Sequence, residues 1–387
     1  MKKIKVYIQY PWNVSDSQYY KSMIENPPKE IEYLPKNQKA GMIINKKRLI
    51  INNYKEKVRV FIEQLKFPIL NSHKTIYSGK YDLTHYAHCL SKKNNGKPWV
   101  ADFESIWQMW ISGRDTKIGR RRVEKILMKK NCKKIIPWTD SAKNEIIKIF
   151  PEIKDKVEVV GFGQTIQKFK KIKKKNIRLL FVGRYFEWKG GVHAVEAIDR
   201  LTKKYDNVDA IVISKTPNKI LNKYSKNKKI KFLELIPHEK LMKEIFPSSD
   251  ILIYPGYSDS FGFIFSESLS FGIPVVTVNG FARKDLIEDK KTGIIIESEI
   301  KSNFKKISSS KSKIVDKIIE GRPSFNEICS SKSKIVDKIV NETSKLIENK
   351  NLRDKMSKNC LMEVKNGRFS IKERNKKLRK IYEEGLK

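Results

Sequence analysis

Two carboxylates that lie eight residues apart flank a Phe-Gly-Phe turn in the most informative stretch of this sequence. Asp259 follows the apolar run 250–254, which is typical of a buried parallel strand, and Glu267 lies about one turn into a predicted helix. The backbone N–H groups at the start of that helix, freed by Gly262, can bind a phosphate. Because a carboxylate can accept hydrogen bonds from two sugar hydroxyls, we expect Glu267 to bind a ribose and Asp259 a hexose. The alternative is a solvated helix with an ordinary aspartate near its start.

A pair of cations follows the strand-like run 177–182. Arg184 and Lys189 lie in a glycine-containing turn before an apolar helical pattern, so they leave the carboxyl end of a predicted parallel strand. Open α/β sheets bind their ligands at that edge. Arginine offers a planar pair of donors and lysine a compact charge, and together they can hold a diphosphate. Taken alone, this turn is also compatible with an ordinary surface loop.

Together these motifs resemble the retaining GT-B glycosyltransferases of family 4, which use nucleotide sugars as donors. The resemblance covers most of the chain. It includes the turn at 183–190, an aspartate version of the family's paired glutamates, and the run 271–276 followed by 292–293. It implies an α/β, GT-B fold, in which two doubly wound Rossmann-like domains have a cleft between them.

The resemblance also implies a role for each matching residue. Arg184 and Lys189 bind the donor diphosphate, Glu267 binds the ribose, and Asp259 contacts the transferred sugar. The turn that contacts the sugar and phosphate consists of Ser260, Phe261, Gly262 and Phe263. Backbone groups near Pro237 contact the base. Asp259 is one methylene shorter than the family's glutamate, so its reach is reduced.

The acceptor side is expected in the N-terminal half. Glu104 follows the strand-like run 98–103, at the position where many family members have a histidine close to the reacting sugar. Its carboxylate can accept a hydrogen bond from the acceptor hydroxyl or the donor sugar. Alternatively, Asp102 and Glu104 cap the following helix. His85 and His88 resemble a family pattern, and we interpret them as core histidines.

The length of 387 residues suits two domains, because single cores seldom grow beyond about 250 residues. The expected boundaries are 1–170 with a crossing helix at about 370–387 for the acceptor-side domain, and 176–369 for the nucleotide-sugar domain. The latter is expected to contain an insertion over about 298–345. Within it, the sequence 309–318 recurs at 330–339. This repeat predicts an added surface helix or, alternatively, a partner-binding hairpin.

The net charge of +39 would attract an anionic membrane or a nucleic acid. No recognisable nucleic-acid-binding motif accompanies it, so nucleic acid is not the expected partner. The segment 117–130 carries five or more cations opposite an apolar side that includes Ile118, Val123 and Leu127. It predicts contact with an anionic bilayer, binding of a phosphorylated acceptor, or an ordinary amphipathic helix packed on the sheet.

The location predicted from the sequence is the cytoplasm, with peripheral contact at the inner membrane face as an option. No apolar run approaches the ~18 residues of a membrane span, and residues 1–10 alternate like a strand instead of forming a signal peptide. The four cysteines are scattered without metal or disulfide spacing. We therefore expect reduced thiols, no metal and no cofactor.

The expected function is retaining, metal-independent transfer of a sugar from a nucleotide sugar to a glycan or lipid-linked acceptor. The candidate catalytic residues are Arg184, Lys189, Asp259 and Glu104. One alternative is a non-catalytic GT-B binding protein, which the short Asp259 side chain favours. The other is a basic nucleic-acid-binding protein, which the net charge alone favours.

Overall fold

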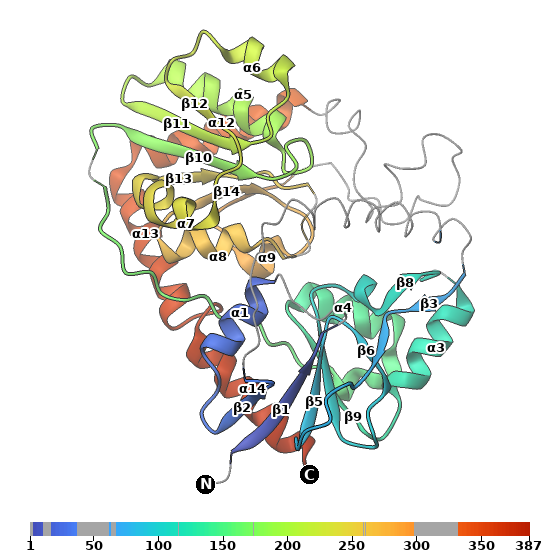
Figure 1. Ribbon diagram of the computed structural model, residues 1–387. Helices are drawn as coiled ribbons and strands as arrows, with labels where there is room; N and C mark the ends of the chain where they lie inside the picture. The colour runs from blue at the N-terminus through green and yellow to red at the C-terminus, as the bar shows by residue number, and fades with distance from the viewer. Residues whose placement is uncertain are drawn as a thin grey trace. The chain divides into compact units, whose positions relative to one another are not determined.

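The computed structural model describes residues 3–10, 17–36, 62, 67–114, 116–172, 174–257, 259, 261–297 and 332–387. They divide into two compact units (Figure 1). Unit 1 comprises Met1–Gly163 and Arg368–Lys387, and unit 2 comprises Gln164–Gly367. The lysine-rich residues 168–172, which precede the first strand of unit 2, are part of that unit. Within the described residues, no helix combines the length and the apolar character that a membrane crossing requires.

Unit 1 is built on a five-stranded parallel sheet with the order β2-β1-β5-β7-β9. Its strands are β1 (Ile4–Gln9), β2 (Ile31–Leu34), β5 (Leu83–Ala87), β7 (Trp99–Phe103) and β9 (Cys132–Pro137). The central strands β5 and β7 are buried along their whole length, as expected for a sheet covered on both faces. Two short ladders lie beside this sheet: β3 (Ile69–Leu70) pairs with β8 (Trp110–Ser112), and β4 (Ser72–Lys74) pairs with β6 (Leu90–Lys93).

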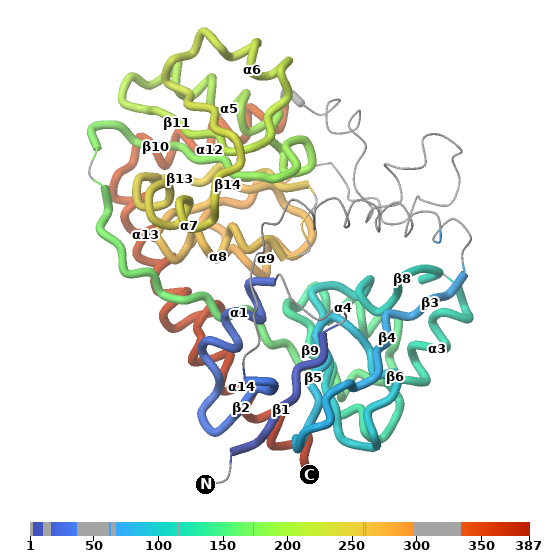
Figure 2. The backbone as a smooth tube through the Cα atoms, viewed as in Figure 1, coloured from blue at the N-terminus to red at the C-terminus, as the bar shows by residue number. Residues whose placement is uncertain are grey.

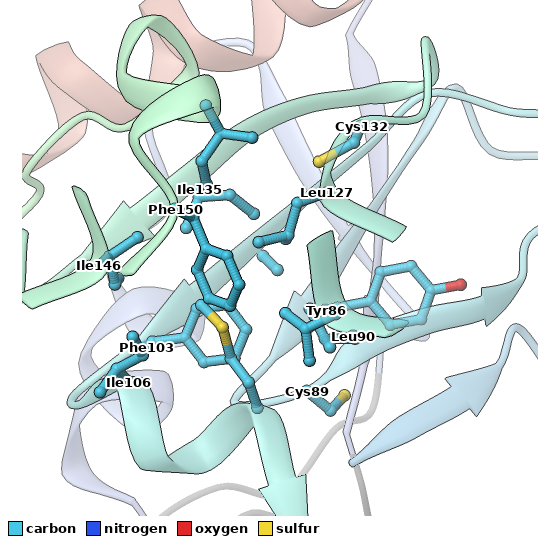
Figure 3. Close-up of a cluster of buried hydrophobic side chains, with 14 of the residues drawn as sticks. Tyr86, Cys89, Leu90, Phe103, Ile106, Leu127, Cys132, Ile135, Ile146 and Phe150 are labelled. Atoms are coloured by element: carbon cyan, nitrogen blue, oxygen red, sulfur yellow. The ribbon is translucent and has the colours of Figure 1, made fainter. Parts of the chain in front are cut away.

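The helices of unit 1 are α1 (Gln18–Glu25), α3 (Lys117–Leu127), α4 (Asp140–Ile149) and α14 (Ile371–Gly385), with 3-10 turns at Ile106–Met109 and Pro151–Lys156. Ser17, Thr116 and Thr139 cap the first three by accepting hydrogen bonds from backbone N–H groups. Figure 3 shows the core, in which side chains of β5, β7, α3 and α4 point toward one another. The last helix, α14, belongs to this unit, and its Tyr382 hydroxyl lies 2.7 Å from Nδ1 of His85.

Unit 2 contains a six-stranded parallel sheet with the order β12-β11-β10-β13-β14-β15. The strands are β10 (Ile177–Gly183), β11 (Val208–Ser214), β12 (Ile230–Leu233), β13 (Ile251–Ile253), β14 (Val275–Val278) and β15 (Gly293–Ile296). The backbone trace in Figure 2 shows β10 and β13 as neighbours, although a long stretch of chain separates them. Two doubly wound parallel sheets confirm the predicted α/β class.

The helices of unit 2 are α5 (Gly191–Lys204), α6 (Asn218–Tyr224), α7 (His238–Lys240), α8 (Phe263–Ser270), α9 (Arg283–Leu286), α12 (Lys332–Glu348) and α13 (Lys350–Lys365). A π turn at Leu241–Ile245 and a 3-10 turn at Phe246–Ser248 follow α7. Helix α5 packs against α12, and α8 packs against α13 and β14. The first copy of the predicted repeat lies outside the described residues, while most of the second copy forms the start of α12.

Candidate functional site

The strand order of unit 2 reverses between β10 and β13, which makes the carboxyl ends of these strands a topological switch point. Ligands of open α/β sheets bind outside the strands at such a point. The loops that leave β10 and β13 are joined here by backbone hydrogen bonds. Gly256 N donates to Lys189 O over 3.1 Å, and Tyr257 N donates to Trp188 O over 2.9 Å. The loop that carries Arg184 and Lys189 is therefore fastened to the loop that carries Asp259.

Glycines permit this close approach of the two loops. Gly190 has a φ of +77°, and a Cβ atom built there would lie 2.5 Å from Cβ of Pro255. Gly256 has a φ of +59°, and a Cβ atom would lie 2.4 Å from Nη2 of Arg283. A side chain at either position would combine backbone strain with a collision. The glycines thus fix where Lys189 and Asp259 lie.

Asp259 is the centre of a nearly buried charge cluster. One carboxylate oxygen forms an ion pair with Nζ of Lys189, although the two residues are 70 positions apart in the sequence. The other accepts a hydrogen bond of 2.9 Å from the Tyr254 hydroxyl and lies 3.5 Å from Nη2 of Arg283. Burial, and then the Asp259 charge, raises the pKa of Tyr254 well above its ordinary value, so its hydroxyl stays protonated and donates.

Arg283 belongs to this cluster and is absent from the sequence-based site. Its side chain is fully buried, donates from Nη2 to the Gly256 carbonyl, and has Cζ 4.7 Å from the centroid of the Phe265 ring. Burial lowers the pKa of Arg283, and the charge of Asp259 opposes that shift. A charged residue in a polar turn usually indicates exposure, so nothing in the sequence distinguished Arg283 from its neighbours.

Arg184 and Glu267 occupy different settings within unit 2. Arg184 comes directly after β10 and is exposed. Glu267 lies on α8 with a side chain that is 10% exposed, and its Oε1 is 2.8 Å from Nε2 of His238. His238 begins α7 directly after Pro237, which is exposed. The structure therefore brings the loop after β12, predicted to contact the base, close to the carboxylate predicted to bind the ribose.

The start of α8 provides backbone donors beside this cluster. Gly262 precedes the helix with a φ of +81°, in the left-handed region that favours glycine. Phe261 is buried, and its ring centroid lies 5.2 Å from that of Phe263. Ser260 lies outside the described residues. The positive end of the helix dipole and the N–H groups of a first helical turn suit a phosphate.

In unit 1, the two carboxylates at the end of β7 differ in their surroundings. Asp102 is fully buried, and it accepts hydrogen bonds from the Tyr20 hydroxyl (2.6 Å), the Trp138 indole (3.2 Å) and the His88 backbone (3.1 Å). Burial opposes its ionisation, but favourable interactions with His85, His88 and Tyr20 outweigh that effect and lower its pKa. Asp102 therefore organises the interior of unit 1.

Glu104 is only half-buried. Its backbone N–H donates to the side chain of Gln108 over 2.8 Å, so Gln108 closes the turn that follows β7. His85, fully buried beside Asp102, is a core histidine as interpreted. These contacts give Glu104 a more solvent-accessible setting than Asp102.

Helix α3 carries the basic segment, and one detail of its prediction is wrong. Gly119, Val123 and Leu127 form its buried side, but Ile118 is 59% exposed and Met128 is 51% exposed. Ile118 is five positions before Val123, which places the two on different sides of an α-helix. One large apolar side chain on this cation-rich helix and another directly after its end are therefore exposed.

Comparison with known proteins shows what this chain resembles. Residues 163–320 match the family described as glycosyl transferases group 1. CapM of Staphylococcus aureus, a capsular polysaccharide biosynthesis glycosyltransferase, is 26% identical over 205 residues, which are 47% of this chain and 52% of CapM. The D-inositol 3-phosphate glycosyltransferase of Paenarthrobacter aurescens is 25% identical over 40% of each chain. The chain thus spans about half the length, or less, of these curated relatives.

Solved structures resemble this chain along nearly its whole length. A glycosyltransferase from Rickettsia africae superposes with a TM-score of 0.60 at 14% identity and covers 100% of this chain and 99% of that one. Anabaena Alr3699/HepE in complex with UDP has a TM-score of 0.60 at 12% identity, with 98% of each chain covered. Residues 163–320 are therefore similar to the glycosyl transferases group 1 family, and the chain has the GT-B fold.

Proposed function

We propose that this protein transfers a sugar from a nucleotide-sugar donor to an acceptor hydroxyl, with retention at the anomeric carbon and without a metal ion. The observation that carries the proposal is the cluster of Lys189, Asp259 and Arg283 beside the start of α8, at the switch point of unit 2. This cluster offers cations and backbone donors where the fold binds anionic ligands. A protein of the same fold, Alr3699/HepE, binds UDP, which is a nucleoside diphosphate.

The chemistry assigned to this chain is electrostatic. The bond between the anomeric carbon and the diphosphate breaks, and negative charge develops on the leaving diphosphate. Lys189, Arg184 and the N–H groups at the start of α8 stabilise that charge. The acceptor oxygen bonds to the same face of the anomeric carbon, and its proton passes to the departing phosphate. Glu267 holds the ribose in ground and transition states alike, and Glu104 accepts a hydrogen bond on the acceptor side.

Thermal unfolding with UDP, GDP, ADP and their hexose conjugates tests the donor. A nucleotide at 100 times its Kd adds about 2.7 kcal/mol of stability, which a thermal shift detects. Slow release of sugar from the matching conjugate then tests turnover. Lys189→Met is expected to lower kcat/KM by roughly 10²-fold. A protein that binds no nucleotide refutes the proposal, and one that binds a donor but never cleaves it is a non-catalytic binding protein.

Glu267→Ala separates binding from chemistry. If the ribose contact is equally strong in the ground and transition states, its loss should raise donor KM and weaken binding of the bare nucleotide, while kcat changes little. Arg178→Met is a matched control, because Arg178 forms a paired contact with Asp209 in the same sheet. Its kinetics should equal those of wild type. A fall in kcat alone for Glu267→Ala contradicts the assigned role.

The acceptor proposed here is lipid-linked or a glycan at an anionic membrane surface. The supporting observation is the exposure of Ile118 on the basic helix α3 and of Met128 directly after its end. Each cation near an anionic bilayer contributes roughly 1 kcal/mol of binding free energy, and apolar side chains strengthen binding further by inserting at the lipid interface. Co-sedimentation with vesicles of 30% phosphatidylglycerol, and with purely zwitterionic vesicles, tests it. Ile118→Asp with Met128→Asp should abolish binding to the anionic vesicles but leave nucleotide binding intact, and unchanged sedimentation excludes this surface.

A further inference from the structure

Arg283 belongs to the cluster that supports the proposed function, but the chemistry proposed above gives it no role of its own. Its guanidinium is fully buried, and its Nε and Nη1 atoms have no hydrogen-bond partner among the residues that the structure describes. A buried charge with unpartnered donors is unfavourable unless something compensates for it. An arginine cannot lose its proton in a protein, so this charge is permanent.

Asp259 contacts more than one cation. One carboxylate lies between two cations, since Lys189 contacts one oxygen and Arg283 lies 3.5 Å from the other. In the proposed function, Lys189 binds the donor diphosphate. The Lys189 ammonium is nevertheless paired with Asp259 in the structure, so it must loosen that pair to reach a phosphate.

A carboxylate as buried as Asp259 cannot easily lose a counter-ion. Its side chain is 9% exposed, and the removal of one partner from a buried ion pair is strongly destabilising. Without a second cation, the movement of Lys189 to the donor would leave the Asp259 carboxylate buried without a counter-ion. Lys189 would then be held at Asp259 and would bind the diphosphate weakly.

We propose that Arg283 is the reserve counter-ion of Asp259, which frees Lys189 to exchange the carboxylate for the donor diphosphate. This inference rests on the proposed function and adds a positioning residue to it. Arg283 is suited to the task because the Gly256 carbonyl and the Phe265 ring hold it in place. Its separation of 3.5 Å from Asp259 leaves room for a closer contact once Lys189 has turned away. Tyr254 continues to donate to the same carboxylate oxygen.

Calorimetry on single and double variants tests the exchange. The probe is whichever of UDP, GDP and ADP binds wild type most tightly. Arg283→Met should weaken Kd at least 10-fold, whereas Arg283→Lys, which keeps the charge, should stay within about threefold of wild type. Asp259→Asn should tighten Kd several-fold, because Lys189 then no longer has to leave the Asp259 carboxylate. Asp259→Asn combined with Arg283→Met should bind like Asp259→Asn alone.

The rescue by the double variant is the decisive readout, because damage to packing at Arg283 would persist when the Asp259 charge is removed. Arg178→Met again serves as the control, since it breaks an arginine–carboxylate pair elsewhere in unit 2 and should leave Kd unchanged. Equal Kd values for wild type and Arg283→Met overturn the proposal. So does a loss in Arg283→Met that Asp259→Asn does not reverse.

Two further outcomes are informative. If Arg283→Met does not fold, Asp259→Asn decides alone, and the absence of tighter binding overturns the exchange. If wild type binds none of the three nucleotides, the proposed function itself fails and the exchange fails with it. The exchange alone fails if wild type binds a nucleotide and the affinity falls when Lys189 is replaced but not when Arg283 is replaced.

Discussion

Gly190→Ala is expected to damage the loop that carries Lys189 by a predictable amount. The backbone at this position has a φ of +77°, and a new Cβ atom would lie 2.5 Å from Cβ of Pro255 and 3.2 Å from the Gly256 nitrogen. The substitution therefore adds backbone strain and a collision. Gly96→Ala supplies the matched control, because Gly96 has a φ of +76° but, its two chain neighbours aside, none of the described residues has a heavy atom within 4 Å of a built Cβ.

The two contributions can be separated by their magnitudes. A left-handed conformation costs an alanine roughly 1–2 kcal/mol, and the reduced entropy of the unfolded chain returns about 0.4–1 kcal/mol. Gly96→Ala should therefore lose about 0.5–1 kcal/mol. Carbon atoms pack best at about 3.5–4.0 Å, and overpacking typically costs roughly 1–3 kcal/mol. Gly190→Ala should therefore lose about 1.5–4 kcal/mol in total.

Urea unfolding followed by circular dichroism measures both losses, with the transitions of the two units fitted separately. Nucleotide titration gives a second readout. Since Lys189 and Gly256 are linked by a backbone hydrogen bond, displacement of Pro255 should also weaken nucleotide binding in Gly190→Ala. Gly96→Ala should bind as wild type. If Gly190→Ala loses no more stability than Gly96→Ala, the close approach of the two loops does not constrain this position.

Three other outcomes follow from single residues. Burial raises the pKa of Cys132 to about 12, so a disulfide exchange reagent at pH 8 should label Cys132 only after urea is added, as mass spectrometry would show; labelling in native buffer contradicts its burial. Burial, and then the nearby Arg178, lowers the pKa of Lys174 to about 8, whereas an unfolded lysine titrates near ~10.4. The folded state therefore holds fewer protons between these values, and the stability of wild type relative to Lys174→Met should rise from pH 8 to about 10.4; a pH-independent difference would refute this. His238→Ala removes the 2.8 Å partner of Glu267 and should raise donor KM roughly tenfold, about 1.4 kcal/mol, with kcat little changed; an unaltered KM would show that His238 does not orient the carboxylate.

The sheet of unit 2 was predictable because its strands are buried on both faces. Such strands read as continuous apolar runs, as in Ile177–Gly183 and Val208–Ser214. Short ladders such as Ser72–Lys74 with Leu90–Lys93 give no comparable signal. They form because distant segments meet, and their residues are partly polar. Local pattern therefore identified the strands of unit 2 but not these ladders.

The placement of the loops that carry candidate residues was predictable from the strands that they follow. Arg184 directly follows β10 and Asp259 lies in the loop between β13 and α8, and the sheet topology alone places these two loops together. The pairing of Lys189 with Asp259 depends on the backbone hydrogen bonds between the two loops. Neither sequence segment has a pattern that predicts these bonds. The burial of Arg283 was not predictable either, because it depends on how α9 packs in the folded unit. The same limit explains Ile118, whose exposure depends on which side of α3 contacts the rest of unit 1.

The placement of α14 determines the order in which this chain can complete its parts during synthesis. Unit 2 is a continuous stretch of chain, whereas unit 1 combines an N-terminal stretch with α14, which the ribosome makes after unit 2. Until then, the buried His85 lacks Tyr382 as its partner, and Ser22 lacks Arg374. The N-terminal stretch therefore cannot complete its core until all of unit 2 has been translated. Unit 2 can finish folding first, so the part of the molecule that begins earlier is the one that matures later.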